Sequence, residues 1–259
     1  MDRSKGFPKG NKTISIIVPV YRAKRFLAET VASVQSQTYE AWELLLVDDC
    51  SGDGSYELAC ELAKKDARVR PILQPENMGA AKARNRGIDE AQGRYICFLD
   101  ADDIWESDKL ERELSFIQKK SAGFVFTGYE FADEEAKGTG KIVHVPEEIT
   151  YRQALKNTTI FTSTVMIDRA IIADDTIYMP QIASEDTATW WQILKRYGKG
   201  YGLDENLVRY RRSANTLSAN KMVAIKRIWK LYRQQEGLSV LYSAYCMCFW
   251  ALRAVLRRV

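Results

Sequence analysis

Three carboxylates follow an apolar run in the middle of the chain, in the stretch FLDADD of residues 98–103. The charges of Asp100, Asp102 and Asp103 repel one another unless a cation or hydrogen-bond donors offset them. Carboxylate oxygens suit Mg²⁺ or Mn²⁺, which in turn bind the phosphate groups of substrates. The alternative is an acidic turn with aspartates at helix-cap positions. Because the acids follow a buried strand, we favour a divalent cation at Asp100 and Asp102, with Asp103 capping the next turn.

A second polar group, made of Asp48, Asp49, Ser51 and Asp53, follows the apolar run of residues 42–47. Carboxylates at the end of a strand can accept hydrogen bonds from a nucleobase N–H or from ribose hydroxyls. Ser51 or Asp53 would equally well cap a following helix. A cap role for one of them leaves the others available to a ligand.

A basic segment, NMGAAKARNRG of residues 77–87, carries Lys82, Arg84 and Arg86 in the first turns of an expected helix. A helix N-terminus favours anions, although solvated charges on an ordinary amphipathic helix would give the same pattern. The segment is neither the GxGxxG loop of dinucleotide-binding folds nor the GxxxxGK[ST] of a P-loop. NAD-dependent redox chemistry and P-loop hydrolysis are therefore poorly supported.

Glu185 and Asp186 stand at the polar start of another expected helix. A carboxylate there could act as a general base toward an attacking hydroxyl. The pair could equally be the acidic residues that are common at helix N-termini. Of Trp190 and Trp191, which follow, we expect one in the core and one as a platform for the sugar ring or lipid of an acceptor.

Basic residues at Arg211, Arg212 and Lys221 could offset the charge of a diphosphate, or form a basic surface loop. Because His144 is the single histidine, a Ser-His-Asp triad and a histidine-rich zinc site are both disfavoured. The five cysteines include no CxxC pair, which favours reduced, intracellular thiols. The N-terminus lacks the apolar segment of a signal peptide.

The elements that must position these residues alternate along the first hundred residues. Apolar, β-branched runs predict strands at 14–20, 42–49, 69–74 and 94–100, with amphipathic helices between them. This alternation predicts right-handed βαβ units and a mostly parallel, Rossmann-like sheet flanked by helices. Ligands of such α/β sheets bind beyond the carboxyl ends of the strands, where the polar groups above lie. Further on, we expect helices at 107–120 and 184–198 and strands at 123–131, 162–170 and 207–213.

The C-terminal segment differs in charge from the rest of the chain. From Lys221 onward it has eight basic residues and one acid, Glu236, although the net charge of the whole chain is +4. Residues 238–252 are uncharged and about five residues short of a membrane-spanning helix. We expect a basic amphipathic helical tail that lies in the interface of an anionic membrane. Packing on the catalytic domain or on a second copy in a homodimer is the alternative, and the continuous apolar block argues against nucleic-acid binding.

Taken in order, these residues resemble the inverting family 2 glycosyltransferases with the GT-A fold, over about residues 13–221. The resemblance rests on a series of motifs: SIIVPVYRA, QTYxxWELLLVDDxSxDG, NxGxxxARNxG, YICFLDADD, the ED pair at 185–186, and YRRSxNTLS. Each motif is weak by itself, but the ordered series at these spacings is specific.

The resemblance implies transfer of a hexose or N-acetylhexosamine from a UDP-sugar to an acceptor hydroxyl, with inversion at the anomeric carbon and with Mn²⁺ or Mg²⁺ as cofactor. The implied nucleotide contacts are Pro19, Tyr21, Asp48, Ser51, Arg84 and Asp100. Asp102, with Asp100, would hold the metal. Asp186, next to Glu185, would deprotonate the acceptor, and the loop of Arg211 and Arg212 would close over the diphosphate. Many relatives have a histidine in that loop, but Arg212 and Ser213 stand there in this chain, so no histidine ligand is carried over.

The expected organisation is an N-terminal extension (1–12), a GT-A catalytic domain (13–221) and the tail (222–259). The catalytic domain would comprise a nucleotide-binding half (13–103) and an acceptor-binding half (104–221). The resemblance suggests a bacterial enzyme of cell-surface polysaccharide synthesis, acting on a lipid-linked saccharide at the cytoplasmic face of the membrane. The alternative is a nucleotidyltransferase or a nucleotide-sugar hydrolase, which would use the same metal-binding acids without an acceptor base.

Overall fold

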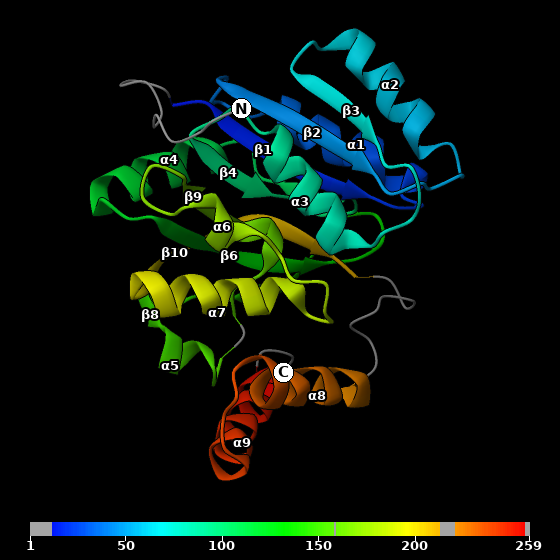
Figure 1. The fold of residues 1–259 in the computed structure, drawn as a ribbon. Helices are drawn as coiled ribbons and strands as arrows, with labels where there is room; N and C mark the ends of the chain where they lie inside the picture. The colour runs from blue at the N-terminus through cyan, green and yellow to red at the C-terminus, as the bar shows by residue number, and fades with distance from the viewer. Residues whose placement is uncertain (1–11, 158, 213–220, 257–259) are drawn as a thin grey trace.

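The first half of the chain forms one side of a large sheet (Figure 1). The computed structural model describes residues 12–157, 159–212 and 221–256. Strands β1 (Ile14–Val20), β2 (Trp42–Asp48), β3 (Val69–Leu73) and β4 (Tyr95–Phe98) lie parallel, in the order β3-β2-β1-β4. All residues of β2 and β4 are buried, as their continuous apolar runs predict. The predicted parallel α/β core is therefore confirmed.

Helices cover both faces of this sheet, because successive side chains of each strand point to opposite faces. Helices α1 (Lys24–Gln35), α2 (Ser55–Lys65) and α4 (Lys109–Lys120) pack on the face that includes Ile16 and Leu44. Helix α3 (Ala80–Glu90) packs with α7 (Glu185–Tyr197) on the face that includes Ile17 and Phe98. The sheet is thus the middle layer between two hydrophobic clusters.

The second half extends the same sheet with mixed strand directions. Strand β9 (Val165–Asp168) is antiparallel to β4 and to β6 (Phe124–Ala132), whereas β10 (Lys199–Arg211) is parallel to β6. At the edges β5 (Ile104–Trp105) and β8 (Glu148–Thr150) pair with β10, and β7 (Gly138–Val143) forms a hairpin with β6. Short helical segments lie between these strands: α5 (Tyr151–Ala154), the 3₁₀ turn η2 (Thr162–Thr164) and α6 (Asp174–Ile177).

Three details differ from the prediction. The last strand begins at Lys199 rather than at residue 207. The prediction missed its first part because that part carries glycines and acids, and it shifts register twice against β6. Residues 162–164, expected in a strand, form η2. Helix α4 begins at Lys109 rather than at residue 107, with Asp108 as its N-cap and no side-chain cap hydrogen bond.

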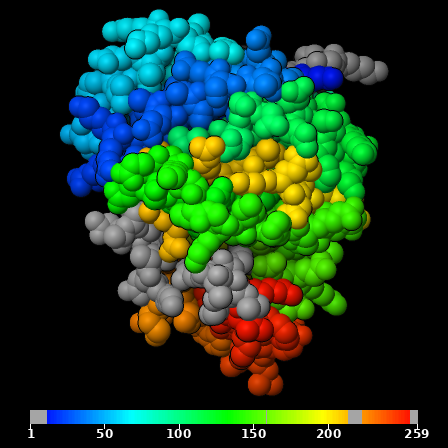
Figure 2. Space-filling model, turned by 180° about the vertical axis from the view of Figure 1, so that it is seen from behind, coloured from blue at the N-terminus to red at the C-terminus, as the bar shows by residue number. Residues whose placement is uncertain are grey.

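The C-terminal tail forms α8 (Lys221–Lys230), the π-helical turn η3 (Leu231–Gln235) and α9 (Val240–Leu256). It lies at one end of the molecule, below α5 and α7, and appears in orange and red in Figure 2. The Tyr151 hydroxyl donates a hydrogen bond to Glu236, and Lys195 forms an ion pair with the same carboxylate at 3.2 Å. Among the described residues, no helix combines the length and apolarity that crossing a bilayer requires.

Candidate active site

The carboxyl ends of β1, β2 and β4 bring the predicted nucleotide-binding residues to one edge of the sheet. The backbone N–H of Asp49 donates to Val20 O at 2.8 Å, and that of Leu99 donates to Ile17 O at 3.0 Å. Pro19 is half-buried, and the Tyr21 ring beyond it is 47% exposed. A phenol ring open to solvent beside three strand ends can stack on a flat base.

Asp48 and Ser51 form a small network at the end of β2. The Asp48 carboxylate is buried and accepts hydrogen bonds from Ser51 N at 2.9 Å and Ser51 Oγ at 2.7 Å. Ser51 Oγ in turn accepts from Arg22 N at 3.0 Å, which ties the loop after β1 to the loop after β2. Arg22 and Cys50 both adopt left-handed backbone conformations, with φ of 51° and 58°. Such conformations are costly for residues other than glycine and cluster at functional sites.

Asp49 has a structural role that the sequence did not reveal. Its carboxylate accepts hydrogen bonds from Met78 N and Gly79 N, each at 2.8 Å. The loop that begins α3 is therefore fastened to the end of β2. Of the adjacent acids, Asp49 shapes the loop, while Asp48 lies with Ser51 at the predicted nucleotide-binding position.

Arg84 joins three elements at the centre of the site. This buried side chain of α3 donates to Asp100 Oδ1 at 2.7 Å and to Glu185 Oε1 at 2.8 Å. Burial alone would lower the pKa of the Arg84 guanidinium, but the charges of Asp100 and Glu185 raise it above its ordinary value. Arg84 thus holds the end of β4 against the start of α7. The sequence predicted Arg84 near the nucleotide but not this double ion pair.

Asp102 carries the least compensated carboxylate of the group. Burial, and then the charge of Asp100, raise its pKa to about 6. In the part of the chain that the structure describes, no side chain donates a hydrogen bond to this carboxylate. The nearby Arg211 Nε donates instead to the Asp102 backbone oxygen, at 2.7 Å. Asp100 and Asp102 repel each other, and no side chain of the described residues donates a hydrogen bond to the Asp102 carboxylate. A bound cation would offset this repulsion.

Asp103 differs from its neighbours because it is fully buried. Its carboxylate accepts from Ser163 Oγ at 2.6 Å and from Arg211 N at 3.1 Å. Burial, followed by the charges of Asp102 and Asp100, raises its pKa well above the ordinary value. Asp103 therefore ties β4 to η2 and β10, a larger role than the predicted cap.

Asp100 and Asp102, which with Ala101 form the DxD turn, are compatible with a divalent cation, though they do not form a complete metal site. No three His, Cys, Asp or Glu side chains of the described residues are grouped to hold a metal ion. Mg²⁺ and similar ions often bind one or two carboxylates and take their remaining ligands from substrate phosphates and water. Asp102 and Asp100 fit that incomplete arrangement.

Glu185 and Asp186 open α7 and have different partners. Glu185 pairs with Arg84; burial raises its pKa, and the Arg84 charge opposes that rise. Asp186 Oδ2 accepts from Thr162 Oγ1 at 3.0 Å, and its Oδ1 accepts from Thr187 N at 2.6 Å. Glu185 is therefore engaged in positioning, whereas Asp186 forms no ion-pair contact among the described residues and retains lone pairs for a proton.

The turn η2 lies between the two groups of acids. Thr162 contacts Asp186, while Ser163 Oγ accepts from Asp100 N at 3.1 Å and donates to Asp103. Sequence reasoning missed this bridge because the stretch TST looks like the start of a strand. The sequence signal that could have revealed the bridge is the run of three hydroxyl residues before an apolar stretch. The structure buries all three hydroxyl residues.

Trp190 and Trp191 both lie in the core, which corrects the prediction that one of them is an acceptor platform. Each is 1% exposed. Trp190 stacks on Phe124 at a centroid distance of 5.5 Å, and Trp191 stacks on Tyr232 of η3 at 5.4 Å. Trp191 therefore joins α7 to η3 of the C-terminal tail.

Trp190→Ala is expected to lower the free energy of unfolding by about 3–5 kcal/mol, because it removes a large buried side chain and leaves a cavity. Chemical denaturation followed by circular dichroism measures this loss. Unchanged stability together with a raised KM for acceptor would contradict the core assignment.

The basic residues at the end of β10 and beyond it are also distributed differently from the prediction. The Arg211 side chain is 2% exposed, and besides Asp102 O it contacts Glu134 O and Glu29, the latter at 2.7 Å. These contacts hold the Arg211 side chain beneath the DxD turn, so it is not free to close over a diphosphate. Arg212 lies over the Phe131 ring at 5.2 Å. Lys221 is the first residue of α8, but its side chain lies outside the described part of the structure.

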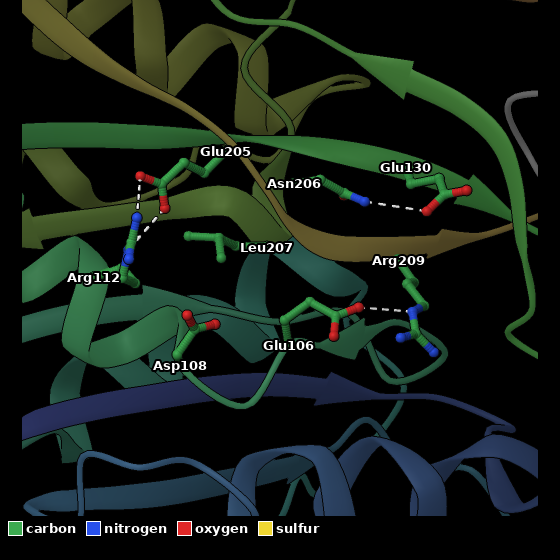
Figure 3. Close-up of a pocket in the computed structure, with 8 residues that line it drawn as sticks. All are labelled: Glu106, Asp108, Arg112, Glu130, Glu205, Asn206, Leu207 and Arg209. Atoms are coloured by element: carbon green, nitrogen blue, oxygen red, sulfur yellow. Dashed lines mark hydrogen bonds and ion pairs between the residues drawn. The ribbon is translucent and has the colours of Figure 1, made fainter.

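A separate open pocket of about 640 Å³ lies along β10 and α4 (Figure 3). Its charged residues are largely paired with one another: Arg112 with Glu205 at 2.8 Å, and Arg209 with Glu106 at 2.7 Å. Both arginines of this pocket therefore already have acidic partners. The edge of the sheet with Asp102 and Asp186 remains the candidate active site.

Comparison with known proteins agrees with this geometry. Residues 15–176 match the family described as Glycosyl transferase family 2. The chain is 42% identical over 247 residues to the putative teichuronic acid biosynthesis glycosyltransferase TuaG of Bacillus subtilis, covering 95% of this chain and 97% of that protein. It is 36% identical over 225 residues to the Escherichia coli UDP-Glc:alpha-D-GlcNAc-diphosphoundecaprenol beta-1,3-glucosyltransferase WfgD, covering 83% of both.

Solved structures share the fold at lower identity. S. aureus TarS 1-349 in complex with UDP-GlcNAc superposes with a TM-score of 0.67 and 20% identity, over 92% of this chain and 70% of that chain. The mannosyltransferase PcManGT from Pyrobaculum calidifontis, in complex with GDP-Man and Mn²⁺, gives a TM-score of 0.70 and 15% identity, over 92% and 73%. The chain has the GT-A fold and belongs to glycosyltransferase family 2.

Proposed function

We propose that this glycosyltransferase moves a hexose or N-acetylhexosamine from a UDP-sugar to a hydroxyl of a lipid-linked saccharide, with inversion, in cell-surface polysaccharide synthesis. The observation that carries the proposal is the Arg84 bridge, which sets the nucleotide-side acid Asp100 beside Glu185 and hence next to Asp186. TarS was solved in complex with UDP-GlcNAc, which supports a UDP-sugar as the donor of this chain. The name of WfgD includes a GlcNAc-diphosphoundecaprenol, which supports a lipid diphosphate as the acceptor.

The chemistry is a single displacement at the anomeric carbon. The acceptor oxygen forms the new bond to that carbon as the bond to the diphosphate oxygen breaks, and UDP leaves with the bonding electrons. The acceptor proton goes to Asp186, whose orientation is fixed by Thr162. Glu185 and Arg84 hold the start of α7 in place and are positioning residues.

Asp102, with Asp100, would hold Mn²⁺ or Mg²⁺. When bound, such a cation supplies positive charge for the departing diphosphate. Asp48 and Ser51 would receive the ribose and uracil, with the exposed Tyr21 ring beside them.

Transfer to an α-D-GlcNAc-diphospho-lipid acceptor, tested with a panel of UDP- and GDP-sugars, examines this proposal. We expect a UDP-sugar to give a product whose new linkage, read by NMR, has the opposite anomeric configuration to the donor. A retained configuration would refute the single displacement, and a GDP-sugar as the sole donor would refute the uridine assignment.

The exposed side of α9 supports a second part of the proposal, contact with the inner face of the cell membrane. Leu241, Tyr245 and Leu252 lie along one side of α9 and are 84%, 48% and 57% exposed. The opposite side packs inward through Cys246 and Trp250. A helix that is apolar on both sides can pack on protein with one and enter a lipid interface with the other, and the basic excess of the tail favours anionic lipid.

The double variant Leu241→Glu, Leu252→Glu is therefore expected to bind anionic phospholipid vesicles at least about tenfold more weakly than the parent chain, because carboxylates replace apolar contacts and repel the surface. Vesicle co-sedimentation measures this. Ile142→Glu, at an apolar site of the β7 hairpin that is 46% exposed, is the control and should bind as the parent does. Unchanged vesicle binding with conversion of a dimer to a monomer would show that this side of α9 meets a second copy instead.

A further inference from the structure

A small pocket lies between the loop that precedes α7 and the first helices of the tail. Its volume is about 280 Å³, and its walls include Ile182 and Ala183 on one side and α8 and η3 on the other. Ala183 is three residues before Asp186, so the pocket adjoins the segment that carries the proposed base. In Figure 1, α8 runs beneath the N-terminal end of α7.

Two cations of α8 line this pocket. Arg227 and Lys230 are three positions apart and so share one side of the helix. Across the described ranges, neither forms an ion pair with an acid, in contrast to Arg84, Arg112 and Lys195. Two like charges that face a common cavity repel each other, and an anion in that cavity would relieve the repulsion.

The remaining walls suit a phosphorylated ligand with an apolar part. The π-helical turn η3 brings Gln234 and Gln235 into the lining, where their amides can donate hydrogen bonds to phosphate oxygens. An arginine guanidinium binds phosphate with two parallel hydrogen bonds, and a lysine contributes a further point charge. Ile182 adds an apolar contact and is itself 38% exposed.

We propose that this pocket, with Arg227 and Lys230 as its principal residues, binds the diphosphate of the lipid-linked acceptor. The inference rests on the proposed function, in which the acceptor hydroxyl meets Asp186. The donor's diphosphate has its own place beside Asp100 and Asp102. An acceptor whose sugar reaches Asp186 would leave its diphosphate at the α8 pocket and its lipid toward the exposed apolar side of α9.

Binding of farnesyl diphosphate to the full chain in EDTA tests the pocket without activity. EDTA removes divalent cations, so the unscreened carboxylates of the donor site repel the diphosphate. The parent chain is expected to bind the probe, and the Arg227→Gln, Lys230→Gln variant to bind it at least about tenfold more weakly, as expected for the loss of charge-assisted hydrogen bonds. Lys226→Gln, an exposed lysine of the same helix outside the pocket lining, is the matched control and should bind as the parent does.

Absence of probe binding by the parent chain, or equal binding by all three proteins, would overturn the proposal. So would a variant that loses affinity for anionic vesicles but keeps its affinity for farnesyl diphosphate, because the two cations would then contact bilayer headgroups. Thermal melting of each variant checks that the tail remains folded.

Kinetics separate this proposal from the proposed function. With an α-D-GlcNAc-diphospho-alkyl acceptor, the double variant should raise KM at least about tenfold, while KM for the alkyl glycoside that lacks the diphosphate stays unchanged. Unaltered KM for the diphosphate acceptor would overturn the pocket and leave the transferase assignment standing. Probe binding that depends on Arg227 and Lys230, without transfer to either acceptor, would support the pocket and count against the assigned acceptor.

Discussion

Asp186→Asn is expected to reduce kcat for glycosyl transfer by about a hundredfold to ten-thousandfold, the range that general-base catalysis contributes. An amide keeps the shape of the side chain and its contacts with Thr162 and Thr187, but it cannot take the proton of the acceptor hydroxyl. Donor binding should be unchanged, because the nucleotide-side residues are untouched. Single-turnover transfer and calorimetric binding of UDP in Mn²⁺ measure the two properties separately.

Asp175→Asn provides the matched control for this substitution. Asp175 is an exposed aspartate of α6 that pairs with Arg196 at 3.0 Å and has no part in the proposed site. The kcat of the Asp175→Asn variant should match that of the parent chain. Full activity of Asp186→Asn would refute the base assignment, whereas equal loss of UDP binding and kcat would point to damage at the start of α7.

Asp102→Asn is expected to abolish the stabilisation of the protein by Mn²⁺ with UDP, and with it metal-dependent transfer. In the parent chain, ligand at about 100 times its dissociation constant adds about 2.7 kcal/mol to the free energy of unfolding. The variant should lose this increment, because Asp100 alone provides one carboxylate. Its stability in EDTA should be at least that of the parent, since the substitution removes the buried charge and its repulsion by Asp100, which together raise the Asp102 pKa.

Thermal unfolding with and without Mn²⁺ and UDP tests both statements. Asp108→Asn, at the start of α4, is the matched control and should keep the full Mn²⁺ response. A normal Mn²⁺ response in Asp102→Asn would show that another residue is the metal ligand. A large loss of stability in EDTA would contradict the view that the Asp102 charge lacks a compensating partner.

The parallel first half of the sheet could be predicted well because its signals are local. Strands β1, β2 and β4 are short apolar runs followed at once by polar residues, so period and sequence order place Asp48 and Asp100 at the same sheet edge. The ion pairs of Arg84 are different: they join residues 16 and 101 positions apart in the chain. A single sequence contains no local pattern that marks such partners.

The errors have a common physical cause, which is that burial of polar and aromatic side chains depends on tertiary contacts. Arg211 looks like a surface cation, yet β10 directs it beneath the DxD turn toward Glu29. Trp191 looks like an available aromatic platform, yet the tail covers it with Tyr232. Helical periodicity places neither partner, because both lie far away in the sequence.

The arrangement also suggests why the two halves of the site act together. Arg84 contacts Asp100 on the proposed donor side and Glu185 on the proposed acceptor side, and η2 contacts Asp103 and Asp186. A shift of either side would strain the same buried contacts. Donor binding at the DxD turn and placement of Asp186 are therefore expected to be coupled.

Release of UDP from a UDP-sugar, measured with and without acceptor and with Mn²⁺ or EDTA, tests the central claim most directly. Metal-assisted transfer to an acceptor predicts rapid UDP release when Mn²⁺ and a saccharide-diphospho-lipid are both present, and little release when either is left out. Equal release without acceptor would indicate a nucleotide-sugar hydrolase, and undiminished acceptor-dependent release in EDTA would contradict the role given to Asp102.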